Sequence, residues 1–496
     1  MPRKKPKAAC PSFHNAEQSF RARAAALEVL NRFKPKPGST AAVLHEMLTK
    51  TTERQRTTDL VCGTIRNRSA IDTVIATLGM CPVKRILPKL LNIIRIGAYE
   101  LIYSATTPEY SIVNEAVENA KAAAGRKHSG FVNGMLRQIE RHIVNRQVAL
   151  SEADTRRTLP QSPMSGCEFD TDILPHPRQA PLDYFRTAFS LPGWLVAAWL
   201  VEFGPETTHK ICFASNRRPS VYVRHNCLKT THAKLTEIFR QAGIEFELPG
   251  CPGPAQAQVT ESANRKDLQF VRDTAQEPLI RIKSPVDISD LAGFAEGLFS
   301  VQDPTAALAA RLLCPEPRQR ILDLCAAPGT KTAQLAELTA DQAEIIATDK
   351  DAKRMEKVAE NIDRLGIEGV TIIPYEHLTR QTEQKGPFDS ILLDVPCSNT
   401  GVLARRVELR HRLTPKTIAS LTKVQSDLLA TASNLLKPGG RICYSTCSIQ
   451  EDENTTVVRS FLKHNPAFKL ESQKLTLPSA EDLDCDGGYA ALITGR

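Results

Sequence analysis

Apolar residues recur at i, i+3 and i+4 spacing through most of the first 145 residues, with short polar breaks between the runs. This spacing places an apolar stripe along one side of a helix. Segments with this pattern are 22–33, 59–79, 87–104, 111–125 and 129–143. Their succession predicts an all-α bundle over residues 17–145.

Two less regular segments follow the bundle. Residues 146–180 lack strong periodicity, and five prolines stand between Pro160 and Pro181, so we expect a linker there. Residues 181–300 mix the helical run "GWLVAAWLVEFG" with the strand-like runs "SVYVRHN" and "GLFSVQ". This mixture predicts a small α+β domain.

From residue 301 onward, short apolar runs alternate with helical runs. The strand-like runs are "QRILDL", "AEIIATD", "VTIIP", "FDSILLD" and "GRICYST". Between them stand helical patterns such as "KRMEKVAENIDRLG" and residues 416–436. Such alternation is typical of parallel strands joined by crossover helices. We therefore predict a multidomain chain that ends in a Rossmann-like α/β domain over residues 301–496.

Composition narrows the class of protein. The chain has 496 residues, of which 42% are hydrophobic and 24% charged, as in globular proteins with several cores. Its 64 Lys and Arg against 55 Asp and Glu give a net charge of +9, which is compatible with a polyanionic partner. The 13 cysteines include no C-x-x-C pair and no zinc-type spacing with histidine. We expect a reduced cytoplasmic protein without a metal.

No segment is predicted to direct secretion or to cross a membrane. The start, "MPRKKPKAAC", is basic but lacks an apolar core, so a disordered tail or an electrostatic contact to nucleic acid is expected. The most apolar stretch, residues 86–105, is interrupted by Lys89, Arg95 and Glu100. It is expected to be a core helix.

The run "LDLCAAPGTKT", residues 322–332, predicts a cofactor site. A strand ends in small residues, which let a ligand approach the backbone, and a helix N-terminus with free N–H groups follows. Asp349 stands 20 residues after Gly329, at the end of the next strand, where a carboxylate can hold the hydroxyls of a ribose. The chain has neither G-x-G-x-x-G nor a P-loop motif. S-adenosylmethionine is the adenosine cofactor that fits these features.

Two cysteines follow strand ends: Cys397 in "FDSILLDVPCSNTG" and Cys447 in "RICYSTCSIQEDEN". Cys443 lies inside a strand, so a buried structural role is expected for it. A thiolate can add to C6 of a pyrimidine, after which C5 can take a methyl group from a sulfonium. Asp394 stands where it either hydrogen-bonds the base or caps the turn. The pattern predicts methylation of a ring carbon.

The stretches "DLCAAPGTKT", "DVPCSNTGVL" and "YSTCSIQEDEN" together resemble the motifs of the RNA (cytosine-5) methyltransferases. The first 145 residues, with "LVCGTIRNRSAID" and "FVNGMLRQI", are similar to the NusB-like RNA-binding domain of the branch that acts on 16S ribosomal RNA. Residues 215–226 and 297–313 are similar to segments that flank the family's catalytic domain. The resemblance implies S-adenosylmethionine-dependent methylation of a cytosine C5 in that RNA.

The same resemblance implies roles for single residues. It makes Cys447 the nucleophile that bonds C6 and Cys397 the residue that helps release the methylated base. It further implies that Lys331 reaches the active site and that Asp394 contacts both cofactor and base. The cofactor residues that it implies are Cys325, Ala326, Ala327, Pro328, Gly329, Thr330, Lys331, Asp349, Glu376 and Asp394.

The chain departs from the family pattern at several positions. Thr330 stands where a second glycine is usual, so the turn there needs a negative φ or room for a side chain. Asn399 stands where glycine or alanine is common. Glu376 replaces the usual aspartate after a shift of one residue. Residues 404–413, "ARRVELRHRL", lack the usual proline.

A cytosine inside a duplex hides C5 and C6, so the substrate base must be unstacked or already in a loop. Candidates for phosphate contacts are residues 265–270, Arg217, Arg218, Arg224, Arg405 and Arg406. Two other functions stay open: a non-catalytic RNA-binding assembly factor, and a methyltransferase of transfer RNA. Nothing in the sequence demands more than a monomer.

Overall fold

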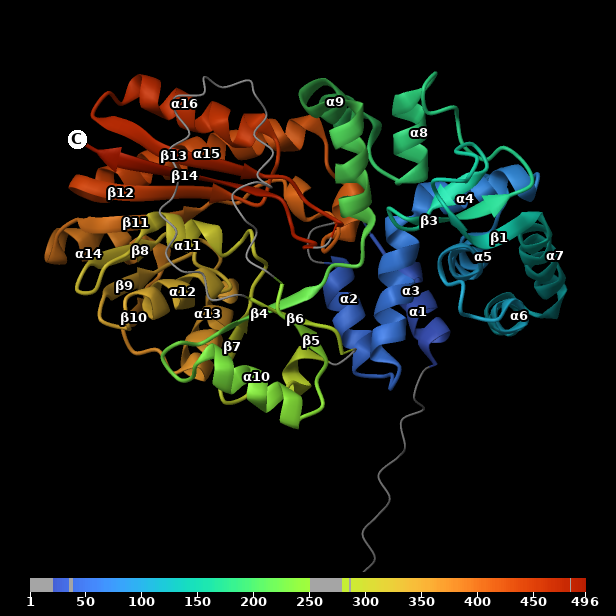
Figure 1. Ribbon diagram of the computed structural model, residues 1–496, viewed down its shortest axis with the longest axis horizontal. Coiled ribbons are helices and arrows are strands. Elements are labelled where there is room, and N and C mark those ends of the chain that lie inside the picture. The colour runs from blue at the N-terminus through green and yellow to red at the C-terminus, as the bar shows by residue number, and fades with distance from the viewer. Residues whose placement is uncertain (1–20, 35–38, 250–278, 285–286, 482) are drawn as a thin grey trace, which may run out of the picture.

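The computed structural model describes residues 21–34, 39–249, 279–284, 287–481 and 483–496. Figure 1 shows a helical bundle on one side and an α/β sheet on the other, with a small sheet and one helix below. The basic segments at 1–10 and 265–270 lie outside the described residues.

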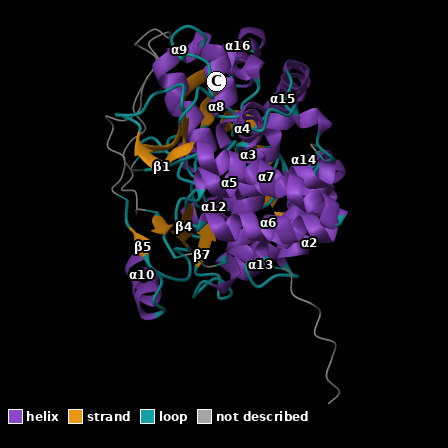
Figure 2. Cartoon of the chain, turned by 90° about the vertical axis from the view of Figure 1, so that its right-hand side faces the viewer, coloured by secondary structure: helices purple, strands orange, loops and turns teal. Residues whose placement is uncertain are grey.

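The N-terminal bundle is helical, as predicted (Figure 2). The segment expected as one helix over 59–79 divides at Asn67, and a helix over residues 39–48 was not expected. The bundle contains α1 (Ala22–Arg32), α2 (Ser39–Leu48), α3 (Arg54–Arg66), α4 (Arg68–Leu78), α5 (Pro88–Tyr103), α6 (Glu109–Ala124) and α7 (Arg126–His142), with a short 3-10 helix at Val83–Arg85. Helix α5 is a core helix, as predicted from its interrupted apolar run. No helix in the described ranges is both long and apolar enough to span a membrane.

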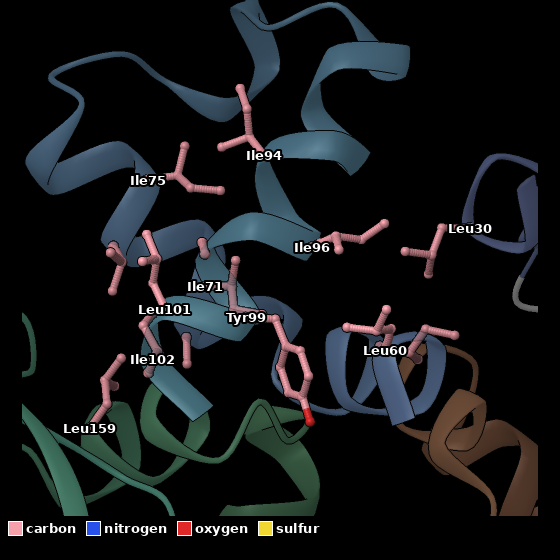
Figure 3. Packing of buried hydrophobic residues seen from close by; sticks show 14 of the residues in the cluster. Leu30, Leu60, Ile71, Ile75, Ile94, Ile96, Tyr99, Leu101, Ile102 and Leu159 are labelled. Carbon is pink, nitrogen blue, oxygen red and sulfur yellow. The ribbon is translucent and has the colours of Figure 1, made fainter. Parts of the chain in front are cut away.

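The linker expected over residues 146–180 carries regular structure instead. Strands β1 (Ile143–Ala149), β2 (Thr158–Pro160) and β3 (Ser165–Phe169) form an antiparallel sheet in the order β1-β3-β2. Leu159 and Phe169 are buried in the bundle core, where Leu159 lies beside α5 (Figure 3). Pro160 ends an edge strand, a position that tolerates its missing N–H. Pro160 therefore marks the end of a strand here rather than an unstructured linker.

The segment 181–300 is divided between two cores. Helices α8 (Pro181–Ala188) and α9 (Gly193–Asn216) pack on the bundle through Phe185 and Trp199. A separate small core lies between α10 (His232–Gln241) and a sheet in the order β5-β6-β4-β7. Its strands are β4 (Val221–His225), β5 (Phe246–Glu247), β6 (Ile280–Ile282) and β7 (Phe299–Val301), with a 3-10 helix at Ile288–Asp290. The two predicted strand-like runs are β4 and β7.

The C-terminal sheet has, among the described residues, the strand order β10-β9-β8-β11-β12-β14-β13. Its strands are β8 (Arg320–Asp323), β9 (Glu344–Ala347), β10 (Val370–Ile372), β11 (Phe388–Asp394), β12 (Leu436–Thr446), β13 (Phe468–Thr476) and β14 (Gly488–Gly495). The first five strands in this order are parallel, as predicted. β14 and β13 add an antiparallel edge that the alternation pattern did not predict.

Helices cover both faces of this sheet. α11 (Leu308–Leu313), α12 (Thr330–Leu338) and α13 (Ala352–Leu365) pack on one face. α14 (Leu378–Lys385), α15 (Pro415–Leu435) and α16 (Thr455–His464) pack on the other. Successive strand residues alternate between the faces: Ile442 faces the second group and Cys443 the first. The fully buried Cys443 confirms the structural role predicted for it.

Arg410 joins the bundle, α9 and the α/β domain. Its buried guanidinium lies in the 3-10 helix Val407–His411 and donates hydrogen bonds to Arg66 O at 2.7 Å, Asn216 Oδ1 at 2.8 Å and Ser215 O at 2.9 Å. Further bonds reach Phe189 O and Leu403 O. Burial lowers the pKa of Arg410 to about 9. These bonds hold three separate segments against one another.

We expect Arg410→Met to destabilise the protein by about 3–5 kcal/mol, because it fills a similar space but leaves buried acceptors of three segments without a donor. Thermal unfolding followed by circular dichroism measures the effect. Arg406→Met, an exposed neighbour, is the matched control, and its midpoint should stay at the wild-type value. Equal midpoints for the two variants would contradict the role given to Arg410.

Candidate active site

The carboxyl ends of β11 and β12 bring the two predicted cysteines together. The strands are adjacent and parallel, with Asp394 opposite Ser445 in register. Cys397 follows β11 and Cys447 follows β12, and their sulfur atoms lie 3.1 Å apart. Cys397 is buried, whereas Cys447 is partly exposed. The Cys447 thiol is therefore open to a ligand, with the Cys397 thiol directly behind it.

Asn399 contacts both cysteines. Its Oδ1 lies 3.0 Å from Cys447 Sγ, and its Nδ2 donates to Cys397 O at 2.6 Å. Asn399 has a φ of +61°, in the left-handed region that asparagine tolerates better than most residues with a side chain. Its place at the thiols could not be predicted, because it depends on the turn after β11.

Glu453 lies beneath the two cysteine loops and joins them. Its carboxylate is fully buried and accepts from Ser398 N at 2.8 Å, Ser448 Oγ at 2.6 Å and Gln425 Nε2 at 3.0 Å, and also from Ser398 Oγ. Ser398 follows Cys397 and Ser448 follows Cys447, whereas Gln425 belongs to α15. One carboxylate thus fixes both loops to a helix. The acidic run after "YSTCS" was the only sequence signal for it.

Lys331 and Asp394 form an ion pair beside the thiols. Lys331 Nζ lies 2.5 Å from Asp394 Oδ2, and Ser445 Oγ donates to Asp394 Oδ1 at 2.7 Å. Burial alone would lower the pKa of Lys331, but the charge of Asp394 and its hydrogen bond raise it above the ordinary value. Lys331 therefore stays positively charged next to Cys447.

The two thiols differ in their surroundings. The hydrogen bond between the sulfurs, burial and the nearby Glu453 raise the pKa of Cys397. Cys397 is thereby held as a thiol that can donate to Cys447. Cys325, in the turn after β8, also has its pKa raised, mainly by burial.

The turn predicted to hold a cofactor consists of small residues and packs closely against α13. Ala326 and Ala327 are buried, and Gly329 has a φ of +98° with only 3.2 Å between the place of a Cβ and Val358 of α13. Thr330 opens α12, and the left-handed conformation falls on Gly329, so Thr330 fits with its side chain. Pro328 in this turn is exposed.

Asp349 lies against this turn. Its Oδ2 accepts from Ala327 N at 3.3 Å, and its Oδ1 accepts from Asp351 N at 3.0 Å. Arg354 Nη2 donates to Ala327 O at 2.7 Å. The predicted turn and the predicted acid thus lie side by side.

Other strand-end residues complete this edge. Asp323 is buried, accepts from Thr332 Oγ1 at 2.7 Å and has its second oxygen unpartnered among the described atoms. Burial raises the pKa of Asp323 to about 7. Glu376 is exposed, in the 3-10 helix Tyr375–His377. Its neighbour Tyr375 is partly buried, and the centre of its ring lies 5.1 Å from Lys350 Nζ. Tyr375 and Cys325 pack against the same apolar cluster. The sequence did not single out Tyr375.

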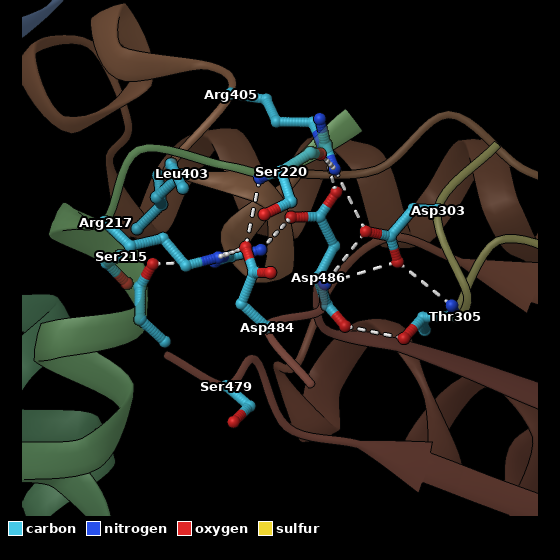
Figure 4. A network of polar contacts seen from close by, with 12 residues as sticks. Ser215, Arg217, Ser220, Asp303, Thr305, Leu403, Arg405, Ser479, Asp484 and Asp486 are labelled. Carbon is cyan, nitrogen blue, oxygen red and sulfur yellow. Dashed lines mark hydrogen bonds and ion pairs between the residues drawn. The ribbon is translucent and has the colours of Figure 1, made fainter. Parts of the chain in front are cut away.

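A network of ion pairs connects the small sheet to the thiol loops (Figure 4). Arg217 contacts Asp484 at 3.2 Å and Asp486 at 2.7 Å. Arg405 contacts Asp486 at 2.5 Å and Asp303 at 3.1 Å. Next in the chain, Gly487 N donates to Gly401 O at 2.8 Å, just after the Cys397 loop.

The arginines named as phosphate contacts therefore have different environments. Arg217 and Arg224 are 7% and 9% exposed and pair with buried acids, Arg224 with Glu337, so phosphate contact is wrong for both. The acids that pair with them lie far away in the sequence. Arg405 is partly exposed within the network. Arg218 and Arg406 are exposed, and their RNA contacts stay a prediction. No group of His, Cys, Asp and Glu able to hold a metal occurs in the described part of the chain.

Three parts of the chain match known protein families. Residues 310–488 match the family described as 16S rRNA methyltransferase RsmB/F, residues 21–141 the NusB family, and residues 191–253 a ferredoxin-like domain of the RsmF/B-like methyltransferases. "Probable ribosomal RNA small subunit methyltransferase B" of Synechocystis sp. is 32% identical over 89% of this chain and 88% of the relative.

Two further similarities extend over nearly the whole chain. Ribosomal RNA small subunit methyltransferase B of Klebsiella pneumoniae is 28% identical over 97% of this chain and 100% of the relative. The solved structure of PH0851 shares the fold with a TM-score of 0.69, at 23% identity, over 96% of this chain and 99% of the other.

We expect Glu453→Gln to destabilise the α/β domain by about 2–4 kcal/mol, because the amide places a donor against other donors. The two cysteine loops should separate, so a short bifunctional thiol reagent should bridge Cys397 and Cys447 more slowly. Peptide mass spectrometry and thermal unfolding measure the two effects. Glu451→Gln, on the same 3-10 helix (Glu451–Glu453) but exposed, is the matched control. Unchanged bridging in Glu453→Gln would refute the joining role.

Proposed function

Because this chain belongs to the 16S rRNA methyltransferase RsmB/F family, we propose that it methylates C5 of a cytosine in small-subunit ribosomal RNA through a covalent cysteine adduct. Methylation of ribosomal RNA with S-adenosylmethionine is the activity of the family. The choice of C5 and the covalent route are the proposal. The observation that carries it is the pair of sulfurs 3.1 Å apart at the ends of adjacent strands.

The residues at the carboxyl edge fit S-adenosylmethionine. A Cβ at Gly329 would lie 3.2 Å from Val358 of α13, and the small side chains of Ala326 and Ala327 leave the backbone of the turn accessible to a ligand at short distance. Asp349 next to the turn suits a ribose diol, and Tyr375 supplies an aromatic ring near Cys325. When bound, S-adenosylmethionine supplies a methyl group as an electrophile on its sulfonium sulfur.

Cys447 is proposed as the nucleophile, as the family motif implies. The Cys447 thiol would pass its proton to solvent as its sulfur bonds C6 of the cytosine, so that the C5–C6 double bond is lost and C5 becomes electron-rich. Lys331, which stays positively charged, lies beside Cys447. C5 would then take the methyl group as its bond to the sulfonium sulfur breaks and S-adenosylhomocysteine leaves.

Cys397 is proposed to assist release. C5 passes its proton to solvent water, the C5–C6 double bond forms again, and the bond from C6 to Cys447 breaks with its electron pair returning to the Cys447 sulfur. Cys397 lies 3.1 Å from the sulfur that must leave, and its raised pKa keeps it able to hold or return a proton there. The burial of Cys397 and the exposure of Cys447 support this division of roles.

Asp394 is proposed to bind the base at N3 or N4 and to stabilise the charge that develops after addition. Lys331 keeps this carboxyl group in place. Cys325, Pro328, Thr330 and the exposed Glu376 are kept as proposed cofactor contacts on the family resemblance alone.

The substrate must offer an unpaired cytosine, because C5 and C6 are covered within a helix. We propose that the NusB-like bundle, from about residue 21 to 145, and the small domain before residue 301 hold folded RNA around the site. Exposed Arg218 and Arg406 are candidate phosphate contacts.

Trapping of the adduct tests the reaction. We expect Cys397→Ala to accumulate an RNA–protein adduct that survives denaturing electrophoresis with S-adenosylmethionine and 16S rRNA transcript, and Cys447→Ala to form none. The reverse result would exchange the roles of the thiols. RNA binding without adduct or methyl transfer by any form of the protein would favour an assembly factor, and transfer of methyl to transfer RNA but not 16S rRNA would favour the other substrate.

We expect Lys331→Met and Asp394→Asn each to reduce methyl transfer by about 10²-fold or more, since each removes a charge beside the reacting base. Single-turnover transfer of labelled methyl measures this. Lys437→Met is the matched control, because Lys437 pairs with Asp389 at 2.7 Å at the opposite end of β11. Equal rates in Lys331→Met and Lys437→Met would contradict the proposed role of Lys331.

A further inference from the structure

The side chain of Asn399 completes a chain of hydrogen bonds through the two thiols. The sulfur atoms of Cys397 and Cys447 are hydrogen-bonded at 3.1 Å, Cys447 Sγ donates to Asn399 Oδ1 at 3.0 Å, and Asn399 Nδ2 donates to Cys397 O at 2.6 Å. The hydrogen bonds thus run from the Cys397 side chain through Cys447 and Asn399 and return to the Cys397 backbone. No other side chain among the described residues contacts both cysteines in this way.

The orientation of the amide follows from its partners. The carbonyl of Cys397 can only accept a hydrogen bond, so the NH₂ group of Asn399 must face it. The carbonyl oxygen of Asn399 must then face Cys447. An amide oxygen accepts a hydrogen bond from a thiol, whereas its partial negative charge repels a thiolate. The amide cannot turn to stabilise a thiolate without losing its bond to Cys397.

The position suits this residue type. With φ at +61°, the backbone at 399 favours glycine or asparagine. A glycine at this position would keep the backbone conformation but leave Cys447 without this acceptor.

We propose that Asn399 is a positioning residue that holds the Cys447 side chain in one rotamer with its proton on sulfur until the RNA base enters. The description of Cys447 as the nucleophile rests on the proposed function. The hydrogen bond restrains the reactivity of the free enzyme toward electrophiles and oxidants that are not its substrate.

The charged groups around Cys447 are held in pairs or hydrogen bonds. The Lys331 cation lies beside Cys447 and is paired with Asp394. Cys397 donates to Cys447 from behind, and the Glu453 carboxylate accepts from Ser398 and Ser448. Asp303, after β7, and Asp486, before β14, are paired with Arg405. Asn399 is uncharged, so Asn399→Gly removes its acceptor without altering this balance of charges.

Alkylation of Cys447 by iodoacetamide, followed over pH by peptide mass spectrometry in the full chain, tests the proposal. Asn399→Gly keeps the backbone conformation and removes the acceptor, so the pH midpoint of Cys447 alkylation should fall by about one pH unit. At a fixed pH below the midpoint, this fall corresponds to an alkylation rate about tenfold higher. Asn399→Asp keeps an acceptor and adds a negative charge, so its midpoint should move up. Exposed Cys314, whose backbone carbonyl accepts from Arg441 of β12, is the internal reference and should not change.

Opposite shifts in the two variants support positioning, because a purely structural defect would move both toward the behaviour of an ordinary free cysteine. Unchanged midpoints, or shifts in the same direction, would overturn the inference. The alkylation readout needs neither RNA nor cofactor. If the shifts occur but the wild-type protein does not methylate RNA, the proposed function fails and the positioning stands. If the wild type methylates and the midpoints stay fixed, the inference alone fails.

Discussion

The buried carboxylate of Glu453 is the interaction on which the site depends. A charge removed from water is stable only when donors surround it, and here the backbone and side-chain donors come from the loops after β11 and β12 and from α15. The requirement to satisfy this charge brings together two loops that are 50 residues apart in sequence. The same segment continues to Gln450, which accepts from Trp199 Nε1 at 2.8 Å, so α9 is tied to the site as well.

Electrostatics then make the two thiols different, although both follow a strand end. Cys397 lies on the buried side, close to Glu453, where its proton is retained. Cys447 lies on the partly exposed side, close to Lys331 and next to the amide of Asn399. Burial and charge thus retain the proton on Cys397, whereas Cys447 is the thiol open to a ligand. The proposed reaction, with one addition step and one elimination step, uses both thiols.

The domains are held together by buried polar groups as well as by apolar packing. Arg410 donates to carbonyl groups of the bundle and α9. The pairs of Arg217 with Asp484 and Asp486 join the segment between α9 and β4 to the loop before β14. That loop contacts Gly401, next to the Cys397 turn. A displacement of the small domain would therefore be transmitted to the thiols through a short and continuous set of contacts.

The sequence by itself determined the strand ends, the glycine turn, the acid after the second strand and both cysteines, because period-2 and period-3.6 patterns and small-residue turns are local properties. It could not determine that Asp394 stands opposite Ser445, since register belongs to the pairing of strands far apart in the chain. Nor could it show that Arg217 is neutralised by acids more than 260 residues away, or that Pro160 ends an edge strand rather than belonging to a linker. The tertiary structure alone decided which charges meet, because burial and long-range pairing set the surroundings of each side chain.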